Sequence, residues 1–189
     1  MSDKYLVLIS KGKPMPANYV PELSAIYGSF LMERNAAVFM KRMLSRANSD
    51  GIRLKIISAY RSVEYQKMLF DKGVKERIES GMSYEEAYAD TSINLALPGE
   101  SEHNSGLAAD IVTMEDYDVD ESFAKTEEFS WLSRNAADFG YILRYPEGKK
   151  HITGYIYEPW HYRFVGVNNA RKITLSGLTL EEYLTCECG

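Results

Sequence analysis

Apolar side chains recur at helical spacing in several stretches of the chain. Between Glu22 and about Arg46 they follow one another at the intervals of an amphipathic helix. The polar triplet 33–35 leaves open whether this stretch forms one helix or two. The same period predicts helices over 63–78 and 129–139. A Ser or Thr followed three residues later by Glu is a capping box, and this pattern predicts helices that begin after Ser83 and Thr179.

Short apolar runs and alternating runs predict the strands. Residues 160–165 alternate strictly, so His161, Arg163 and Val165 share one face and aromatic side chains occupy the other. Further strands are predicted over 5–9, 53–58, 107–112 and 141–143. Helices that precede and separate short strands indicate an α+β domain with a small, mainly antiparallel sheet packed by helices.

The composition is that of an ordinary globular domain. The chain of 189 residues is long enough for a sizeable core, so we expect a single domain over 1–189. Hydrophobic residues make up 45% and charged residues 26%, and the net charge of −5 comes without a polybasic block. Neither a nucleic acid nor an anionic membrane is therefore expected as the main partner.

The start of the chain carries an apolar run of only five residues, 5–9. A signal peptide has roughly 7–15 apolar residues before a small-residue cleavage site. A membrane span has about 20. We therefore expect no membrane span and a cytoplasmic protein, unless a targeting segment precedes Met1.

Two segments far apart in the chain carry residues that can bind a metal ion. His103 and Asp110 lie in the first and His161 in the second, and the chain has three histidines in all. Zinc accepts two imidazoles and a carboxylate in catalytic sites, where three protein ligands leave one position open. A straight strand would place His103 and Asp110 on opposite faces, so we expect the chain to bend at Gly106.

Glu158 stands three residues before His161 and is followed by Pro159. A turn or bulge at this proline is expected to bring the carboxylate beside the metal. There it would take a proton from the attacking water and later donate it to the leaving amine. Each of these residues alone is more often a satisfied polar group, but the two segments together point strongly to metal-dependent hydrolysis.

The pattern Ser-x-His-x-x-Gly-x-Ala-x-Asp over 101–110, followed by Glu-x-Trp-His over 158–161, resembles the signature of the D-Ala-D-Ala metallopeptidases. This is the VanX/VanY group, which also resembles hedgehog and lysostaphin-type metal folds. The likeness extends to 58–62, 65–66 and 140–146, and so covers roughly residues 52–166. It is nearest to the VanXY type, which implies a cytoplasmic enzyme with both D,D-dipeptidase and D,D-carboxypeptidase activity.

The resemblance implies zinc, hydrolysis of the bond before a terminal D-Ala, and remodelling of cell-wall precursors, including glycopeptide resistance. It implies that the zinc ligands are His103, Asp110 and His161. It further implies that Glu158 is the catalytic base and that Arg61 stabilises the oxyanion, which a fixed guanidinium can meet with two donors. Gln66 and Ser101 match positions that bind the terminal carboxylate of the substrate, and Trp160 is expected to pack behind the site.

Two other functions remain open on the sequence. An L-alanyl-D-glutamate endopeptidase of phage-lysin type would use the same chemistry on another substrate. A non-catalytic, hedgehog-like metal-binding module would need neither Glu158 nor Arg61, so their presence argues against it. His151 lies in a polar loop and is interpreted as solvated. Cys186 and Cys188 are interpreted as thiols of a tail and not as a disulfide framework.

Overall fold

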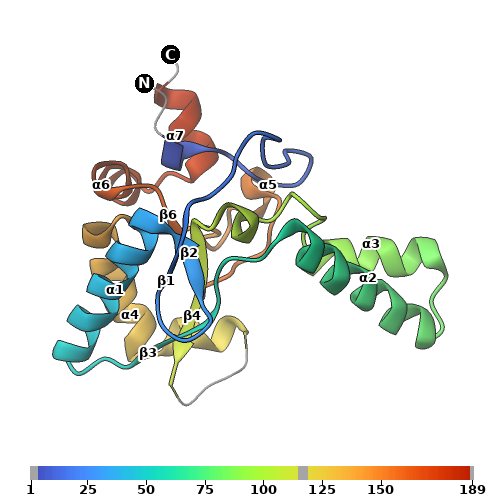
Figure 1. The fold of residues 1–189 in the computed structure, drawn as a ribbon, viewed down its shortest axis with the longest axis horizontal. Helices are drawn as coiled ribbons and strands as arrows, with labels where there is room; N and C mark the ends of the chain where they lie inside the picture. The colour runs from blue at the N-terminus through green and yellow to red at the C-terminus, as the bar shows by residue number, and fades with distance from the viewer. Residues whose placement is uncertain (1–3, 115–118, 188–189) are drawn as a thin grey trace.

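The computed structural model describes residues 4–114 and 119–187. Its centre is a four-stranded antiparallel sheet in the order β3-β4-β6-β5, of which β3, β4 and β6 are labelled in Figure 1. The strands are β3 (Leu54–Ser58), β4 (Ala108–Thr113), β5 (Tyr141–Leu143) and β6 (His161–Phe164). The two central strands are those predicted to carry the metal ligands. The predicted α+β class with a small antiparallel sheet is confirmed.

One face of the sheet packs on helices and forms the main core. Ala109 and Ile111 of β4 and Tyr162 and Phe164 of β6 all belong to one buried hydrophobic cluster. Helices α1 (Arg34–Ser49) and α4 (Glu127–Asn135) contribute to it, and a 3-10 helix, Ala136–Phe139, continues α4. Because side chains alternate along a strand, the residues between these point to the opposite face, where the metal segments lie.

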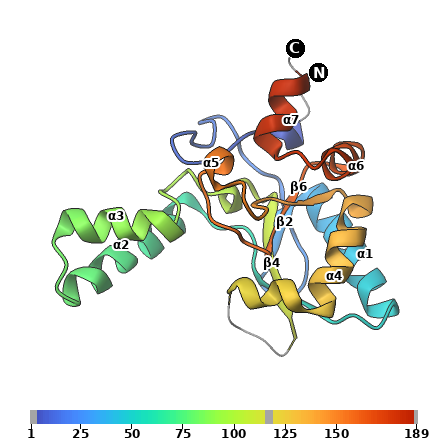
Figure 2. The ribbon, with the colours of Figure 1, turned by 180° about the vertical axis from the view of Figure 1, so that it is seen from behind.

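Two helices project from this body as a hairpin. Helices α2 (Val63–Glu79) and α3 (Tyr84–Asn94) pack on each other and extend away from the sheet in both views (Figures 1 and 2). A small separate cluster of Phe70, Val74 and Ala87 joins them. The predicted capping box before α3 is present, with Ser83 and Glu86 each accepting the other's backbone N–H.

The C-terminal part forms a second, smaller cluster. Helices α6 (Val167–Ser176) and α7 (Leu180–Glu187) supply most of its side chains. Leu6 and Leu8 of the N-terminal segment pack against the same cluster, so the beginning and the end of the described chain lie side by side. The capping box before α7 is confirmed by mutual hydrogen bonds between Thr179 and Glu182.

Two predicted elements near the N-terminus were wrong. The segment predicted as a strand over 5–9 contains a short 3-10 helix, Lys4–Leu6. The first part of the predicted helix over 22–46 is a hairpin of β1 (Leu23–Ala25) and β2 (Leu31–Glu33). Helix α1 begins only after Glu33, because the Glu33 carboxylate accepts the N–H groups of Asn35 and Ala36 and caps it.

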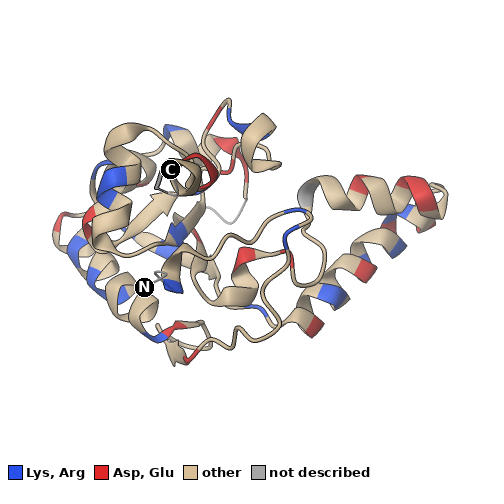
Figure 3. Ribbon diagram, turned by 90° about the horizontal axis from the view of Figure 1, so that it is seen from above, with Lys and Arg blue, Asp and Glu red and all other residues tan. Residues whose placement is uncertain are grey.

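The other boundaries follow the predictions closely. Strands β3, β4, β5 and β6 and helices α2, α3, α4 and α7 all lie where the sequence pattern placed them. Helix α6 and the short α5 (Lys150–Thr153) were not predicted. Acidic and basic side chains alternate along α2 and form pairs one helical turn apart, whereas the charged side chains of α3 are all acidic (Figure 3). In the described part of the chain no helix is both long and apolar enough to cross a bilayer.

Candidate active site

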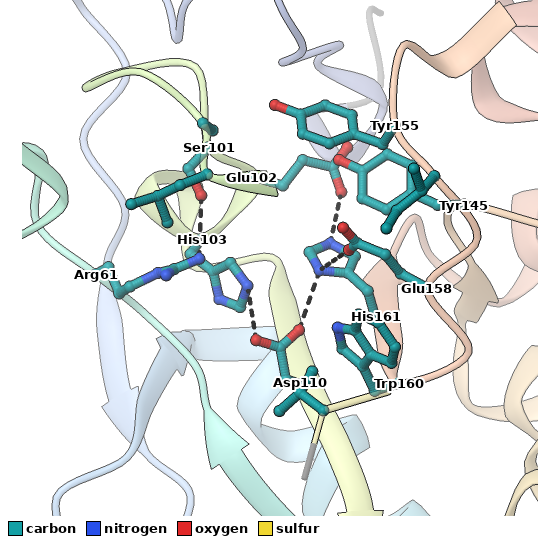
Figure 4. Close-up of a pocket in the computed structure, with 14 residues that line it drawn as sticks. Arg61, Ser101, Glu102, His103, Asp110, Tyr145, Tyr155, Glu158, Trp160 and His161 are labelled. Atoms are coloured by element: carbon teal, nitrogen blue, oxygen red, sulfur yellow. Dashed lines mark hydrogen bonds and ion pairs between the residues drawn. The ribbon is translucent and has the colours of Figure 1, made fainter. Parts of the chain in front are cut away.

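A cavity of about 310 Å³ opens beside the ends of β4 and β6 (Figure 4). Its wall contains all three predicted metal ligands, the predicted base Glu158, and both Arg61 and Ser101. Gln66 is not part of this wall. Its buried side chain donates from Nε2 to the carbonyl of Ala96, 2.7 Å away, and Ala96 lines the cavity.

The three candidate ligands meet because of one turn and one strand pairing. A 3-10 helix, Glu102–Ser105, ends at Gly106, whose φ of 71° is left-handed and suits glycine. A side chain there would place its Cβ 2.8 Å from the backbone nitrogen of Glu33. The turn carries His103 back over β4, and the β4–β6 register sets Asp110 directly opposite His161. The ligand atoms of these three residues all lie within 4.8 Å of one another.

Each imidazole turns one nitrogen toward Asp110 and the other toward a fixed acceptor. His103 Nε2 is 3.2 Å from Asp110 Oδ2, and its Nδ1 donates to the carbonyl of Ala59 at 2.7 Å. His161 Nδ1 is 3.1 Å from Asp110 Oδ1, and its Nε2 is 3.4 Å from Glu102 Oε2. In a tetrahedral zinc site, ligand atoms lie roughly 3.4 Å apart. The donor set and its spacing therefore fit zinc.

The surroundings of the two imidazoles shift their pKa values in opposite directions. Burial lowers the pKa of His103, and the nearby Arg61 charge lowers it further, against the attraction of Asp110. Burial also acts to lower the pKa of His161, but its hydrogen bonds with Asp110 and Glu102 outweigh this and raise it to about 9. The same contacts with both imidazoles hold the pKa of Asp110 far below its usual range despite burial. Asp110 is therefore ionised at neutral pH.

Glu158 reaches the site through the turn that Pro159 predicts. The backbone N–H of His161 bonds the carbonyl of Glu158, and residues 159–160 form the turn. Glu158 Oε2 then lies 3.8 Å from His161 Nδ1 (Figure 4). Burial raises the pKa of Glu158 to about 7, against the attraction of His161. A carboxyl group with this pKa can both accept and release a proton near neutrality.

Arg61 and Ser101 stand on the other side of the cavity. Arg61 Nη2 donates to Ser101 Oγ at 3.4 Å, and no hydrogen-bond partner is found for the buried Arg61 Nε among the described residues. Two hydrogen bonds hold the backbone of Arg61 in place. The side-chain amide of Asn104 donates to the Arg61 carbonyl, and the Arg61 N–H donates to the carbonyl of His103. The Arg61 guanidinium thus faces the cavity from the side opposite Glu158 (Figure 4).

Aromatic side chains form the remaining wall. The rings of Tyr145 and Tyr155 lie 4.7 Å apart, and Tyr145 packs on His161 at 4.9 Å (Figure 4). Trp160 lines the cavity and also packs against the main core, as expected of a residue behind the site. His151 is exposed and does not line the cavity. Cys186 is exposed and free, whereas Cys188 lies outside the described residues.

Glu102 is a further residue of the cavity wall that the sequence motifs do not assign, and it is fully buried. Its Oε1 accepts from Arg144 and Arg163, and these two guanidinium groups keep its pKa well below the usual range although burial acts to raise it. A signal was present. Strand alternation had placed Arg163 on the face of His161, and a buried arginine there requires a carboxylate partner.

A family model described as VanY, D-alanyl-D-alanine carboxypeptidase, matches residues 29–167. The chain belongs to the VanY family. The matched segment contains every residue of the cavity described above. It leaves out the N-terminal segment and all of helix α7.

Named relatives agree with the VanY family. The chain is 37% identical over 183 residues to a D-alanyl-D-alanine carboxypeptidase of Enterococcus faecalis, covering 96% of this chain and 66% of that protein. It thus spans just under two thirds of that relative's length. It is 32% identical over 186 residues to VanXYC of Enterococcus gallinarum, a bifunctional D-Ala-D-Ala dipeptidase and carboxypeptidase, covering 94% of this chain and 92% of that protein.

Solved VanY-type structures superpose over nearly the whole chain. A point mutant of the D,D-pentapeptidase VanY from a VanB-type resistance cassette, in complex with Zn(II), is 36% identical with a TM-score of 0.83, over 95% of this chain and 98% of that one. VanYB in complex with D-Ala-D-Ala is 36% identical with a TM-score of 0.84, over 96% of this chain and 97% of that one. The LD-carboxypeptidase LdcB is 34% identical with a TM-score of 0.79, over 94% of this chain and 84% of that one.

Proposed function

We propose that this protein is a zinc-dependent D,D-carboxypeptidase that removes the terminal D-Ala from cell-wall peptides ending in D-Ala-D-Ala. The observation that carries this proposal is the meeting of His103, Asp110 and His161 within 4.8 Å in a cavity that also holds Glu158 and Arg61. The Zn(II) and D-Ala-D-Ala complexes of VanY-type structures support it.

His103 Nε2, the Asp110 carboxylate and His161 Nδ1 would hold the metal. Zinc, when bound, supplies a Lewis acid that polarises the scissile carbonyl and lowers the pKa of water. The backbone carbonyl of Ala59 and the carboxylate of Glu102 keep the two imidazoles turned toward it.

Glu158 carries the proton through the reaction. Its carboxylate takes a proton from the attacking water and delivers it to the nitrogen of the departing D-alanine, and it is then ready for the next turnover. In the metal-free protein the pKa of Glu158 is about 7, so neither protonation state of its carboxyl group is strongly favoured near neutral pH.

Arg61 and Ser101 meet the negative charges of the substrate. The Arg61 guanidinium stabilises the charge that develops on the carbonyl oxygen, and the Ser101 hydroxyl donates to the terminal carboxylate. Gln66 acts one step away from the substrate, by holding the Ala96 carbonyl and so the wall of the cavity. This replaces the direct carboxylate contact expected from the sequence for Gln66.

Two related activities have specific support. The likeness to VanXYC favours dipeptidase action on free D-Ala-D-Ala, and the likeness to LdcB favours removal of D-Ala that follows an L-residue. We propose D,D-carboxypeptidase action as the main activity, because the family model and the E. faecalis relative carry that description.

D-Ala release from three substrates tests the proposal. The zinc-loaded protein is given free D-Ala-D-Ala, a muramyl pentapeptide ending in D-Ala-D-Ala, and a muramyl tetrapeptide ending in L-Lys-D-Ala. We expect fastest release from the pentapeptide and none after chelation. Fastest release from the dipeptide or tetrapeptide would reassign the substrate. No release from any of them, with zinc verified in the protein, would refute the proposal.

A further inference from the structure

A chain of buried ion pairs connects the metal site to the C-terminal helix. At its centre, Glu102 Oε1 accepts from Arg144 Nε at 2.7 Å and from Arg163 Nη1 at 2.6 Å. The side chains of all three residues are 0% exposed. The second oxygen, Oε2, lies 3.4 Å from His161 Nε2. Glu102 therefore joins two cations to a metal-site imidazole.

Both arginines continue outward to the ends of the chain. Arg144 Nη1 and Nη2 donate to the two carboxylate oxygens of Glu181 in α7, at 2.9 and 2.6 Å. Arg163 Nη2 donates to the backbone carbonyls of Tyr5 and Val7, at 2.9 and 2.7 Å. Glu181, Tyr5 and Val7 all lie outside the segment that the VanY family model matches.

Charge balance shows why Glu181 belongs to this arrangement. Glu102 alone would face two buried guanidinium groups, and an uncompensated buried charge is strongly unfavourable. Glu181 supplies the second negative charge with bidentate geometry, and its side chain is itself only 14% exposed. Stability alone would be served equally well by apolar side chains of similar volume, so the network calls for another explanation.

The orientation of His161 provides that explanation. An imidazole ligand presents one nitrogen to the metal, and a carboxylate on its other N–H fixes both the tautomer and the ring. Glu102 Oε2 occupies the Nε2 side, which leaves Nδ1 facing Asp110. Glu102 can do this only while its own carboxylate is fixed, and Arg144 and Arg163 fix it through Oε1.

We propose that Glu102 is a positioning residue for His161, and that Glu181 of α7 acts through Arg144 to hold Glu102 in place. The C-terminal helix α7 then helps to orient a ligand of the metal site. The proposal rests on the metal role of His161 in the proposed function, so its test measures metal binding directly and not through turnover.

Zinc affinity, measured by competition with a chelator above pH 9, where the proton of His161 no longer competes with the metal, compares three variants with the wild-type protein. Loss of a carboxylate that supports a ligand typically weakens metal binding about 10–100-fold. We expect that loss for Glu102→Gln, and a loss of about tenfold for Glu181→Gln. Lys149→Met is the matched control, because Lys149 pairs with Glu182 of the same helix without joining the buried chain. Its affinity should stay within about twofold of wild type, below the range for a supporting carboxylate.

A second readout reports the hydrogen bond itself. In ¹⁵N-histidine-labelled protein, the Nε2–H of His161 should give a slowly exchanging resonance in the wild type and in Lys149→Met. The resonance should be lost in Glu102→Gln and exchange faster in Glu181→Gln. Since Glu102→Gln leaves buried arginines poorly compensated and can fail to fold, Glu181→Gln decides the outcome in that case.

Three results separate the possible failures. Wild-type affinity and an unchanged resonance in Glu181→Gln would overturn the proposal and leave the proposed function intact. An equal loss in Lys149→Met would also overturn it, because general docking of α7 would then explain the effect. Absence of zinc binding by the wild-type protein itself would refute the proposed function.

Discussion

Among single residues, Glu158 is the one on which turnover should depend most. The change Glu158→Gln keeps the shape of the side chain and removes its ability to accept a proton. We expect D-Ala release to fall by about 10²–10⁴-fold, the usual contribution of a positioned acid–base group. Zinc content should stay at the wild-type level, because Glu158 is not among the three clustered ligands. Initial rates and metal analysis of the same preparation check both expectations.

Glu147→Gln is the control for this change. Glu147 is exposed and lies outside the cavity, so its substitution alters the net charge by the same amount without touching the site. Its rate should equal that of the wild type. Near-normal turnover by Glu158→Gln would show that Glu158 takes no part in the mechanism. The proposed metal ligands would not be affected by that result.

The same residue should make the metal-free protein less stable at high pH. Burial raises the pKa of Glu158 from 4.5 to about 7 in the folded protein. The folded state therefore holds this proton more tightly than the unfolded state. The stabilising contribution is complete below about pH 4.5 and is lost as the pH rises through 7. A shift of this size corresponds to about 3 kcal/mol of unfolding free energy.

Urea unfolding of chelator-treated protein tests this stability effect. The glutamine of Glu158→Gln carries no charge at either pH. The free energy of unfolding of this variant, relative to that of the wild type, should therefore rise by about 3 kcal/mol between pH 4.5 and pH 8. Comparing the two proteins at each pH cancels the titration of groups that are distant from Glu158. A difference that is the same at both pH values would show that Glu158 titrates normally.

The sequence pointed to the candidate ligands and the candidate base that the fold brings into one cavity, but not to the residues that contact them. Two histidines, an aspartate and a glutamate in short motifs are visible without a fold, because their chemistry is unusual in combination. Glu102 was overlooked because its role depends on Arg144 and Arg163, which approach it from two other strands or their ends. Gln66 matched a motif position, yet its contact with Ala96 depends on how the helical hairpin joins the body.

At the level of elements, hydrophobic period and capping boxes predicted the four strands of the central sheet and helices α2, α3, α4 and α7. The hydrophobic period failed over 22–33, where the β1–β2 hairpin has strands of only three residues. Two such strands joined at Gly28, which has a φ of 54°, place apolar residues at intervals that also fit a helix. Helix α6 went unpredicted although it buries Ala170 and Ile173, because its other positions are mostly polar.

The turn at Gly106 is the element-scale feature on which the site depends. Gly106→Ala combines a left-handed backbone with a Cβ 2.8 Å from the Glu33 nitrogen. Gly148→Ala is a matched control, since its φ of 76° is similar and nothing lies within 4 Å of the added Cβ. The control should lose about 1–2 kcal/mol from the left-handed backbone alone.

Gly106→Ala should lose more stability than this control and should also bind zinc less tightly. The clash pushes the turn away from β2, and this movement carries His103 away from Asp110. Thermal unfolding and zinc competition on both variants measure the two effects. Equal losses of stability with unchanged zinc affinity would show that the turn moves without disturbing the ligands.

For the whole molecule, zinc should act as a pH-dependent stabiliser. The ligands come from β6, β4 and the 3-10 helix before β4, and both strands contribute side chains to the main hydrophobic cluster, so a bound ion joins segments that belong to the main core. A ligand that binds only the folded state stabilises it in proportion to the logarithm of its affinity. Chelation should therefore lower the melting temperature of the whole domain in one cooperative transition.

The size of that effect should depend on the proton of His161. Its pKa of about 9 means that metal must displace a proton from His161 at neutral pH, whereas the lowered pKa values of His103 and Asp110 leave those ligands ready. Each pH unit below 9 then costs about tenfold in zinc affinity. Between pH 8 and pH 6, stabilisation by a fixed excess of zinc should fall by about 2.7 kcal/mol. Urea unfolding with and without zinc at both pH values measures this difference, and zinc stabilisation independent of pH would show that His161 binds no metal or carries no proton.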